Sequence, residues 1–75
     1  MGKLVAWFGL GRASAQRAET RRIAAAYQHW LEVEHPALWR AHGEALGRLL
    51  AEATPATLAD RIAAADRLVA RHAAA

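Results

Sequence analysis

The sequence predicts an all-α fold, either a small three-helix bundle or a kinked helical hairpin, with an apolar N-terminal segment. More than a quarter of the 75 residues are alanine, a strong helix former, and valine, isoleucine and threonine are few. Large apolar residues recur at helical steps of three and four. The two prolines, Pro36 and Pro55, divide this periodic region into three stretches. We therefore expect residues 13–75 to form one helical domain, preceded by a separate segment at residues 1–12.

The first helix is expected over residues 14–34, with Ser14 as its N-cap. Its large apolar residues follow steps of three and four, which places them on one face of a helix. These residues are Ile23, Tyr27, Trp30 and Leu31. The face that they form is predicted to be buried.

The second helix is expected over residues 37–53, after Pro36. A proline lacks the backbone N–H donor and disfavours helical geometry in the residue before it. The sequence therefore predicts either a very short corner at this point or one long helix that bends there. Gly43 and Gly47 lie one turn apart and are unfavourable in a helix interior, so we expect another backbone to pass close to them.

The third helix is expected over residues 56–72, with Thr54 as N-cap and Pro55 at the first helical position. Its apolar residues form a heptad-like stripe that predicts packing along another helix of the same chain. The core predicted from all three helices consists of Ile23, Tyr27, Trp30, Leu46, Leu50, Leu58, Ile62 and Val69.

Catalytic and metal-binding patterns are missing from the sequence. No two of the four histidines are three or four residues apart, which is the spacing that a helical metal pair needs. The chain has no cysteine, a single serine and no glycine-rich phosphate loop after a strand. We therefore expect no enzyme activity, no cofactor, no metal site and no small-molecule substrate.

Positive charge is concentrated at the N-terminal end. Residues 1–22 hold five basic groups and one acidic group (net +4), whereas the rest of the chain holds five basic and six acidic groups (net −1). Four arginines in this region can bind phosphates of a nucleic acid or carboxylates of a protein. They are Arg12, Arg17, Arg21 and Arg22. A helix-turn-helix motif does not fit residues 51–72, because Pro55 stands where that turn usually needs positive φ.

The first ten residues carry an unusual density of large apolar side chains, at Leu4, Val5, Trp7, Phe8 and Leu10. Three interpretations are open: the segment folds back and caps the bundle, inserts into a groove on a partner, or lies in a membrane interface. Tryptophan and arginine are enriched in interface hot spots. The predicted partner-binding residues are Leu4, Trp7, Phe8, Arg12, Arg17, Arg21 and Arg22.

The function expected from these features is a non-enzymatic protein–protein interaction module. It would self-associate, or act as a small subunit or regulator in a larger bacterial or phage assembly, since nine arginines to one lysine are typical of GC-rich genomes. The alternatives are a nucleic-acid-binding regulator and a small protein that associates with a membrane surface. The chain has no apolar run long enough to span a bilayer, so we expect a cytoplasmic protein.

Overall fold

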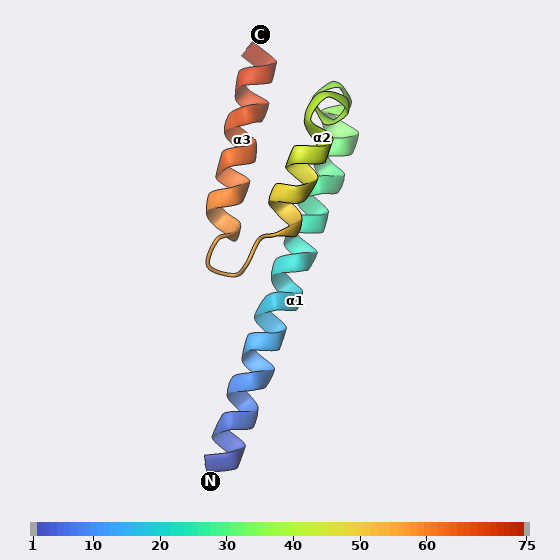
Figure 1. Cartoon of the computed structure of the whole chain (residues 1–75). Coiled ribbons are helices and arrows are strands. Elements are labelled where there is room, and N and C mark those ends of the chain that lie inside the picture. Colours follow the sequence, from blue (N-terminus) through green and yellow to red (C-terminus); the bar gives the residue numbers. More distant parts are fainter. Residues whose placement is uncertain (1, 75) are drawn as a thin grey trace.

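The computed structural model describes residues 2–74, and the side chains of residues 13–74. These residues form a three-helix bundle without strands, which confirms the predicted all-α fold. The helices are α1 (Gly2–Glu34), α2 (Pro36–Ala51) and α3 (Leu58–Ala74). Consecutive helices run in opposite directions, so that α3 is parallel to α1, and the N-terminal half of α1 extends past both of the others (Figure 1).

Helix α1 begins twelve positions before the expected start, and the prediction of Ser14 as an N-cap is wrong. Ser14 is an exposed residue inside the helix. The physical reason lies in the residues before it: Gly9 and Gly11 each disfavour a helix by only about 1 kcal/mol relative to alanine. No proline interrupts the 33 residues of α1. The backbone of residues 2–12 therefore continues α1 and does not turn back toward the bundle.

The corner between α1 and α2 consists of a single residue, His35, with φ −133° and ψ 60°. Its N–H donates to the Leu31 carbonyl and its own carbonyl accepts from the Trp39 N–H, both at 2.9 Å. Pro36 occupies the first position of α2, where a backbone N–H would have no hydrogen-bond partner within the helix, so the N–H that proline lacks is not needed. Of the two arrangements that the sequence allows at Pro36, the structure thus has the short corner.

The connection between α2 and α3 contains a tight turn at residues 54–57. The Thr54 carbonyl accepts from the N–H groups of Thr57 (3.0 Å) and Leu58 (2.9 Å). Thr57 accepts the Thr54 N–H on its hydroxyl (2.9 Å), and its carbonyl accepts the Arg61 N–H (3.0 Å). Helix α3 therefore begins at Leu58, three residues after the Pro55 that was predicted for its first position, and the residue at the N-cap is Thr57 and not Thr54. Pro55 belongs to the turn.

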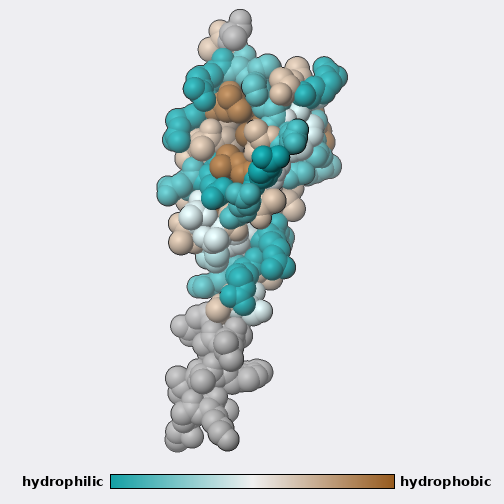
Figure 2. All heavy atoms as spheres, in the orientation of Figure 1, coloured by the Kyte–Doolittle hydropathy of each residue, from teal (hydrophilic) through white to brown (hydrophobic). Residues whose placement is uncertain are grey.

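The core lies mainly between α1 and α2 and consists of leucine and alanine. Its buried members are Ala24, Leu31, Leu38, Leu46, Leu50 and Ala65. The predicted burial of Leu46 and Leu50 is confirmed. Other predicted core residues are only half-buried, namely Ile23, Tyr27, Leu58, Ile62 and Val69. On the face that Figure 2 shows, apolar residues accordingly appear as islands bordered by hydrophilic ones.

The predicted burial of Trp30 is wrong, because its side chain is 42% exposed. Neighbouring residues lie about 100° apart around a helix, so Trp30 and Leu31 cannot both point inward, and Leu31 takes the inward position. The Trp30 ring packs on the surface instead. It tilts against Tyr27 with ring centroids 5.5 Å apart, and meets His35 edge-on at 5.0 Å.

No second backbone explains the glycine at position 43. A Cβ added to Gly43 would lie 3.0 Å from Cε2 of Trp39, and one added to Gly47 would lie 3.8 Å from Cη2 of the same ring. Among the nearest described atoms, the one from another helix is Oε1 of Gln28, 3.9 Å from that second Cβ position. The expected close backbone is thus replaced by the indole of Trp39, which needs the space that a missing Cβ leaves on its own helix.

Candidate protein-binding surface

A groove runs between α1 and the end of α2, at the point where the N-terminal half of α1 leaves the bundle. It has a volume of about 360 Å³. Alanine and proline make up much of its lining, and the charged groups come from α1 alone. The lining residues are Ala13, Gln16, Arg17, Thr20, Arg21, Ala51, Ala53, Thr54 and Pro55. A smaller hollow of about 190 Å³ continues it along α1 and shares Thr20, Arg21, Ala51 and Ala53.

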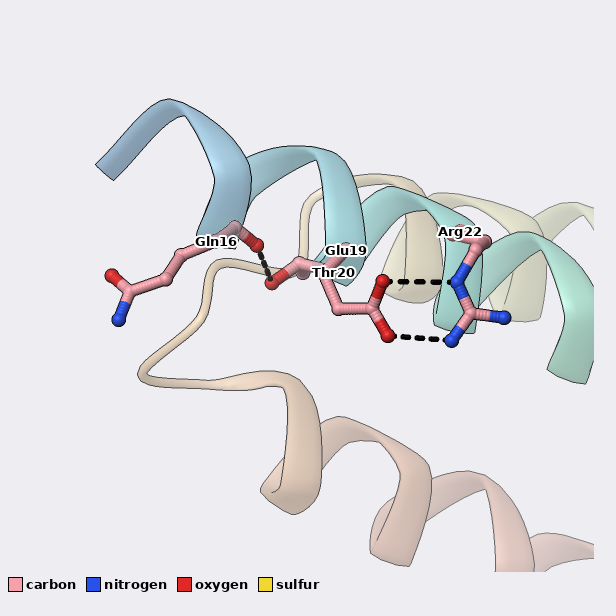
Figure 3. Close-up of polar contacts among 4 residues, drawn as sticks. All are labelled: Gln16, Glu19, Thr20 and Arg22. Carbon is pink, nitrogen blue, oxygen red and sulfur yellow. Dashed lines mark hydrogen bonds and ion pairs between the residues drawn. The ribbon is translucent and has the colours of Figure 1, made fainter. Parts of the chain in front are cut away.

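The structure divides the three predicted arginines whose side chains it describes into two sets. Arg17 and Arg21 are four residues apart on α1, so both reach the groove. Neither forms an ion pair with any described residue. Arg22 lies on another side of α1 and binds Glu19, with Nη2–Oε1 and Nε–Oε2 distances of 2.5 Å and 3.0 Å (Figure 3). Among the side chains that the structure describes here, the unneutralised positive charge is therefore that of Arg17 and Arg21.

The pairing of Arg22 with Glu19 shifts the pKa of both groups. Hydrogen bonding from the guanidinium lowers the pKa of the Glu19 carboxyl, and the same bond raises the pKa of Arg22. Both side chains are more than half exposed, so water screens the interaction and it adds little to stability. Its consequence is local: Arg22 already has a carboxylate partner, unlike the two groove arginines.

Thr20 forms the buried polar part of the groove floor, a role that the sequence does not reveal. Its Oγ1 donates to the carbonyl of Gln16 at 2.8 Å (Figure 3). This bond within one turn satisfies the hydroxyl, and no described buried side-chain polar atom lacks a partner. The only hint in the sequence is the helical spacing that places Thr20 on the same face as Ala24 and Leu31.

Four of the predicted partner-binding residues lie outside the part of the chain whose side chains the structure describes. They are Leu4, Trp7, Phe8 and Arg12, for which the structure describes the α1 backbone alone. Arg17, Arg21 and Arg22 are exposed, as a binding role requires.

A second surface lies on the other side of α1, near the corner. It contains Trp30 and Val33, which are 42% and 58% exposed and are the large apolar residues that the described part of the chain leaves most open to water. Trp30 is held in place by Tyr27 and His35. Sequence periodicity missed this surface because it assigned Trp30 to the core.

Among the described residues, no group of three or more histidine, aspartate or glutamate side chains is arranged to hold a metal ion. The described helices also lack an apolar stretch of the length that crossing a bilayer requires. No protein-family model, curated protein or solved structure matches the chain. A function therefore has to follow from the surfaces described above.

Proposed function

We propose that this protein is a non-enzymatic protein–protein interaction module that binds through the N-terminal half of α1. The observation that carries the proposal is the difference in helix length. Helix α1 has 33 residues and is about 50 Å long, whereas α2, which packs against it, has 16 residues and is about 24 Å long. About half of α1 thus extends beyond its neighbour (Figure 1).

A helix in water obtains most of its stability from packing, so a projecting half-helix gains from a partner. The sequence of this half supplies large apolar residues at positions 4, 7 and 8. Tryptophan is among the residues that contribute most to protein interfaces. The partner-binding set that we propose is the one that the sequence indicates, Leu4, Trp7, Phe8 and Arg12 with Arg17, Arg21 and Arg22.

The groove supports a protein partner that brings carboxylates to Arg17 and Arg21. The groove presents alanine and proline beside the two guanidinium groups, so it offers apolar contacts as well as positive charge. A peptide that carries both apolar and acidic side chains matches this combination. Arginine binds carboxylate with two parallel hydrogen bonds, and the described residues offer no such partner to either arginine.

Sedimentation velocity together with protein capture tests this proposal. Replacing both aromatic residues, by Trp7→Ala and Phe8→Ala, should abolish self-association and the capture of partners from an extract. Far-UV circular dichroism of the same variant checks that the bundle remains helical. A wild-type chain that is monomeric at every concentration, combined with capture that the two substitutions leave unchanged, would refute the proposal.

Nucleic-acid binding is the competing function, and its salt dependence separates it from the proposal. Four phosphate contacts would give a log–log salt slope near −3.6 on duplex DNA, and Arg17 and Arg21 alone would give about −1.8. We expect no binding at physiological salt, because Arg22 is engaged by Glu19 and the chain beyond residue 22 has a net charge of −1. A gel-shift titration at two salt concentrations decides this.

A further inference from the structure

The groove between α1 and the end of α2 has two walls of different chemistry. The α1 wall carries Arg17 and Arg21, which are the charged residues of the lining. The opposite wall consists of the last residue of α2 and the connection that follows it, and it is largely apolar. Its members are Ala51, Ala53, Thr54 and Pro55. A ligand that fills the groove therefore has to present negative charge on one side and an apolar surface on the other.

The two groove arginines lack a carboxylate partner. No described side chain forms an ion pair with Arg17 or Arg21, and residues 1–12 contain no aspartate or glutamate. Of the acids nearby in the chain, Glu19 is engaged by another arginine, and Glu52 is not part of the groove lining. Like charges four residues apart on a helix repel each other slightly. A ligand with carboxylates removes this repulsion and offers each guanidinium two parallel hydrogen bonds.

We infer that the groove binds an extended acidic segment of a partner protein, in which two acidic side chains flank one apolar side chain. This inference rests on the proposed function and specifies the chemistry of the partner. Successive side chains of an extended chain point in opposite directions, and those two residues apart are separated by about 6.6–6.8 Å on the same side. Arg17 and Arg21 are about 6 Å apart along α1. Each carboxylate thus meets one guanidinium, while the middle side chain contacts the opposite wall.

The end of α2 determines which way the acidic side chains point. Carbonyl groups at the C-terminal end of a helix carry a partial negative charge, and α2 ends at Ala51, in the wall opposite the arginines. The exposed Glu52 adds a negative charge next to that wall. Carboxylates on this side would be repelled. The alternating segment therefore has one favourable orientation, with its acids toward α1 and its apolar side chain toward Ala53 and Pro55.

A helical segment matches the groove less well. A helix with its side chains is about 10–12 Å wide, so a single turn occupies roughly 400–600 Å³. The groove has a volume of about 360 Å³. Neighbouring side chains of a helix also point about 100° apart, and so do not face two opposite walls. The smaller hollow of about 190 Å³ continues the groove along α1, in the direction that an extended segment would follow.

Two peptides of identical composition test the segment. The probe is Gly-Ser-Glu-Leu-Glu-Ser-Gly, acetylated and amidated, and the control is Gly-Ser-Glu-Glu-Leu-Ser-Gly, which has the same charge without the alternation. Each is titrated into the full-length chain labelled with nitrogen-15. The probe should shift the amide signals of Ala53 and Thr54 and the Nε–H signals of Arg17 and Arg21, with a dissociation constant of about 1 mM or lower. The control should bind at least about fivefold more weakly, because one of its acids faces the wrong wall.

Substitutions locate the contact. Arg17→Ala and Arg21→Ala should each raise the dissociation constant of the probe about tenfold, and Arg17→Lys, which keeps the charge but not the paired hydrogen bonds, about threefold. Arg40→Ala, on an exposed position of α2, removes the same charge elsewhere and should change it less than about twofold. Glu52→Gln should not raise it, since it removes a repelling charge. Both groove arginines are exposed, so circular dichroism should stay helical.

Three results would overturn the acidic segment: absence of groove shifts at about 10 mM probe, equal affinities of the two peptides, or equal effects of Arg17→Ala and Arg40→Ala. The proposed function is judged separately, by the loss of self-association and capture after Trp7→Ala and Phe8→Ala. If that loss occurs while the probe does not bind, the interaction module stands and the acidic segment is wrong. If the probe binds while capture is unchanged, the groove site stands and the role of the aromatic residues is wrong.

Discussion

The α1–α2 hairpin and the third helix are held by different forces. Four leucines, Leu31, Leu38, Leu46 and Leu50, are buried between α1 and α2. In α3 the buried residue is Ala65, and the larger apolar residues of that helix are half-exposed. Polar contacts add to the apolar packing of α3 against the hairpin. The Tyr27 hydroxyl donates to Asp66, and Arg61 Nη1 donates to the Leu49 carbonyl at 2.9 Å.

This difference indicates where the fold is strong. Leucine burial makes the hairpin the more stable unit, because the transfer of apolar area from water is the largest favourable contribution to folding. Helix α3 docks through a small residue that lets it approach closely and through a few hydrogen bonds. Local opening involves elements with few buried apolar contacts, so we expect α3 to separate before the hairpin unfolds.

The largest effect should come from the hairpin. Leu38→Ala leaves a cavity at a fully buried site and should destabilise the protein by about 2–5 kcal/mol. A chain of this length has a total stability of roughly 4–11 kcal/mol, so much of it would be lost. Chemical denaturation measures the effect, with Val33→Ala at a protein concentration low enough to exclude self-association as the exposed control. Equal losses in the two variants would contradict the leucine core.

A slightly smaller effect is expected where α3 meets the hairpin. Ala65→Leu adds bulk at a buried contact and should destabilise the native state by about 1–3 kcal/mol, mainly by displacing α3. Limited proteolysis should then cut the α2–α3 connection faster than in the natural protein. Ala70→Leu is the matched control on an exposed position of the same helix. If both variants were cut at the same rate, close approach at Ala65 would not be what holds α3.

The hydrogen bonds of Arg61 should contribute less. Its Nε also donates to Thr57 Oγ1 at 3.3 Å, so this side chain links the end of α2 to the start of α3. Arg61→Ala leaves the Leu49 carbonyl without that donor and should lower the free energy of unfolding by about 1–2 kcal/mol. Arg67→Ala, exposed on the same helix, should change it by less than about 0.5 kcal/mol. If Arg61→Ala and Arg67→Ala changed the free energy of unfolding by similar amounts, the hydrogen bonds of Arg61 would not contribute to stability.

The smallest effect should appear only at alkaline pH. Burial, and then the hydrogen bond to Asp66, raise the pKa of Tyr27, so the folded state holds its proton above pH 10, where an unfolded tyrosine loses it. The associated stability is therefore complete below about pH 10 and decreases as the pH rises beyond it. Tyr27 is the sole tyrosine, so absorbance near 295 nm reports it alone.

Two comparisons check the origin of that shift. The tyrosine of the folded protein should ionise at higher pH than in denaturant, and Tyr27→Phe should remove this component of the alkaline destabilisation. Identical titration in the folded and denatured states would rule out a protected Tyr27.

Local sequence signals determined the helices and most of their boundaries. Alanine, leucine, arginine and glutamate, all strong helix formers, make up more than half of the chain, and a proline acts on its immediate neighbours, so α1 ends at Glu34 as predicted. The inward direction of Leu46 and Leu50 also follows from periodicity, since their helix has one clearly apolar side. The start of α1 was missed because glycine weakens a helix without ending it.

Tertiary structure decided which of two adjacent residues points inward, and what the exposed ones meet. Leu31 and Leu38 are buried while Trp30 and Trp39 are more exposed, because neighbouring positions differ by about 100° and the narrow space between close helices fits leucine better than indole. The division of the arginines likewise needed the fold. The spacing of Arg17 and Arg21 shows that they share a side of α1, but the groove beside them exists only because the turn at Thr54, more than thirty residues away in the chain, packs against that side.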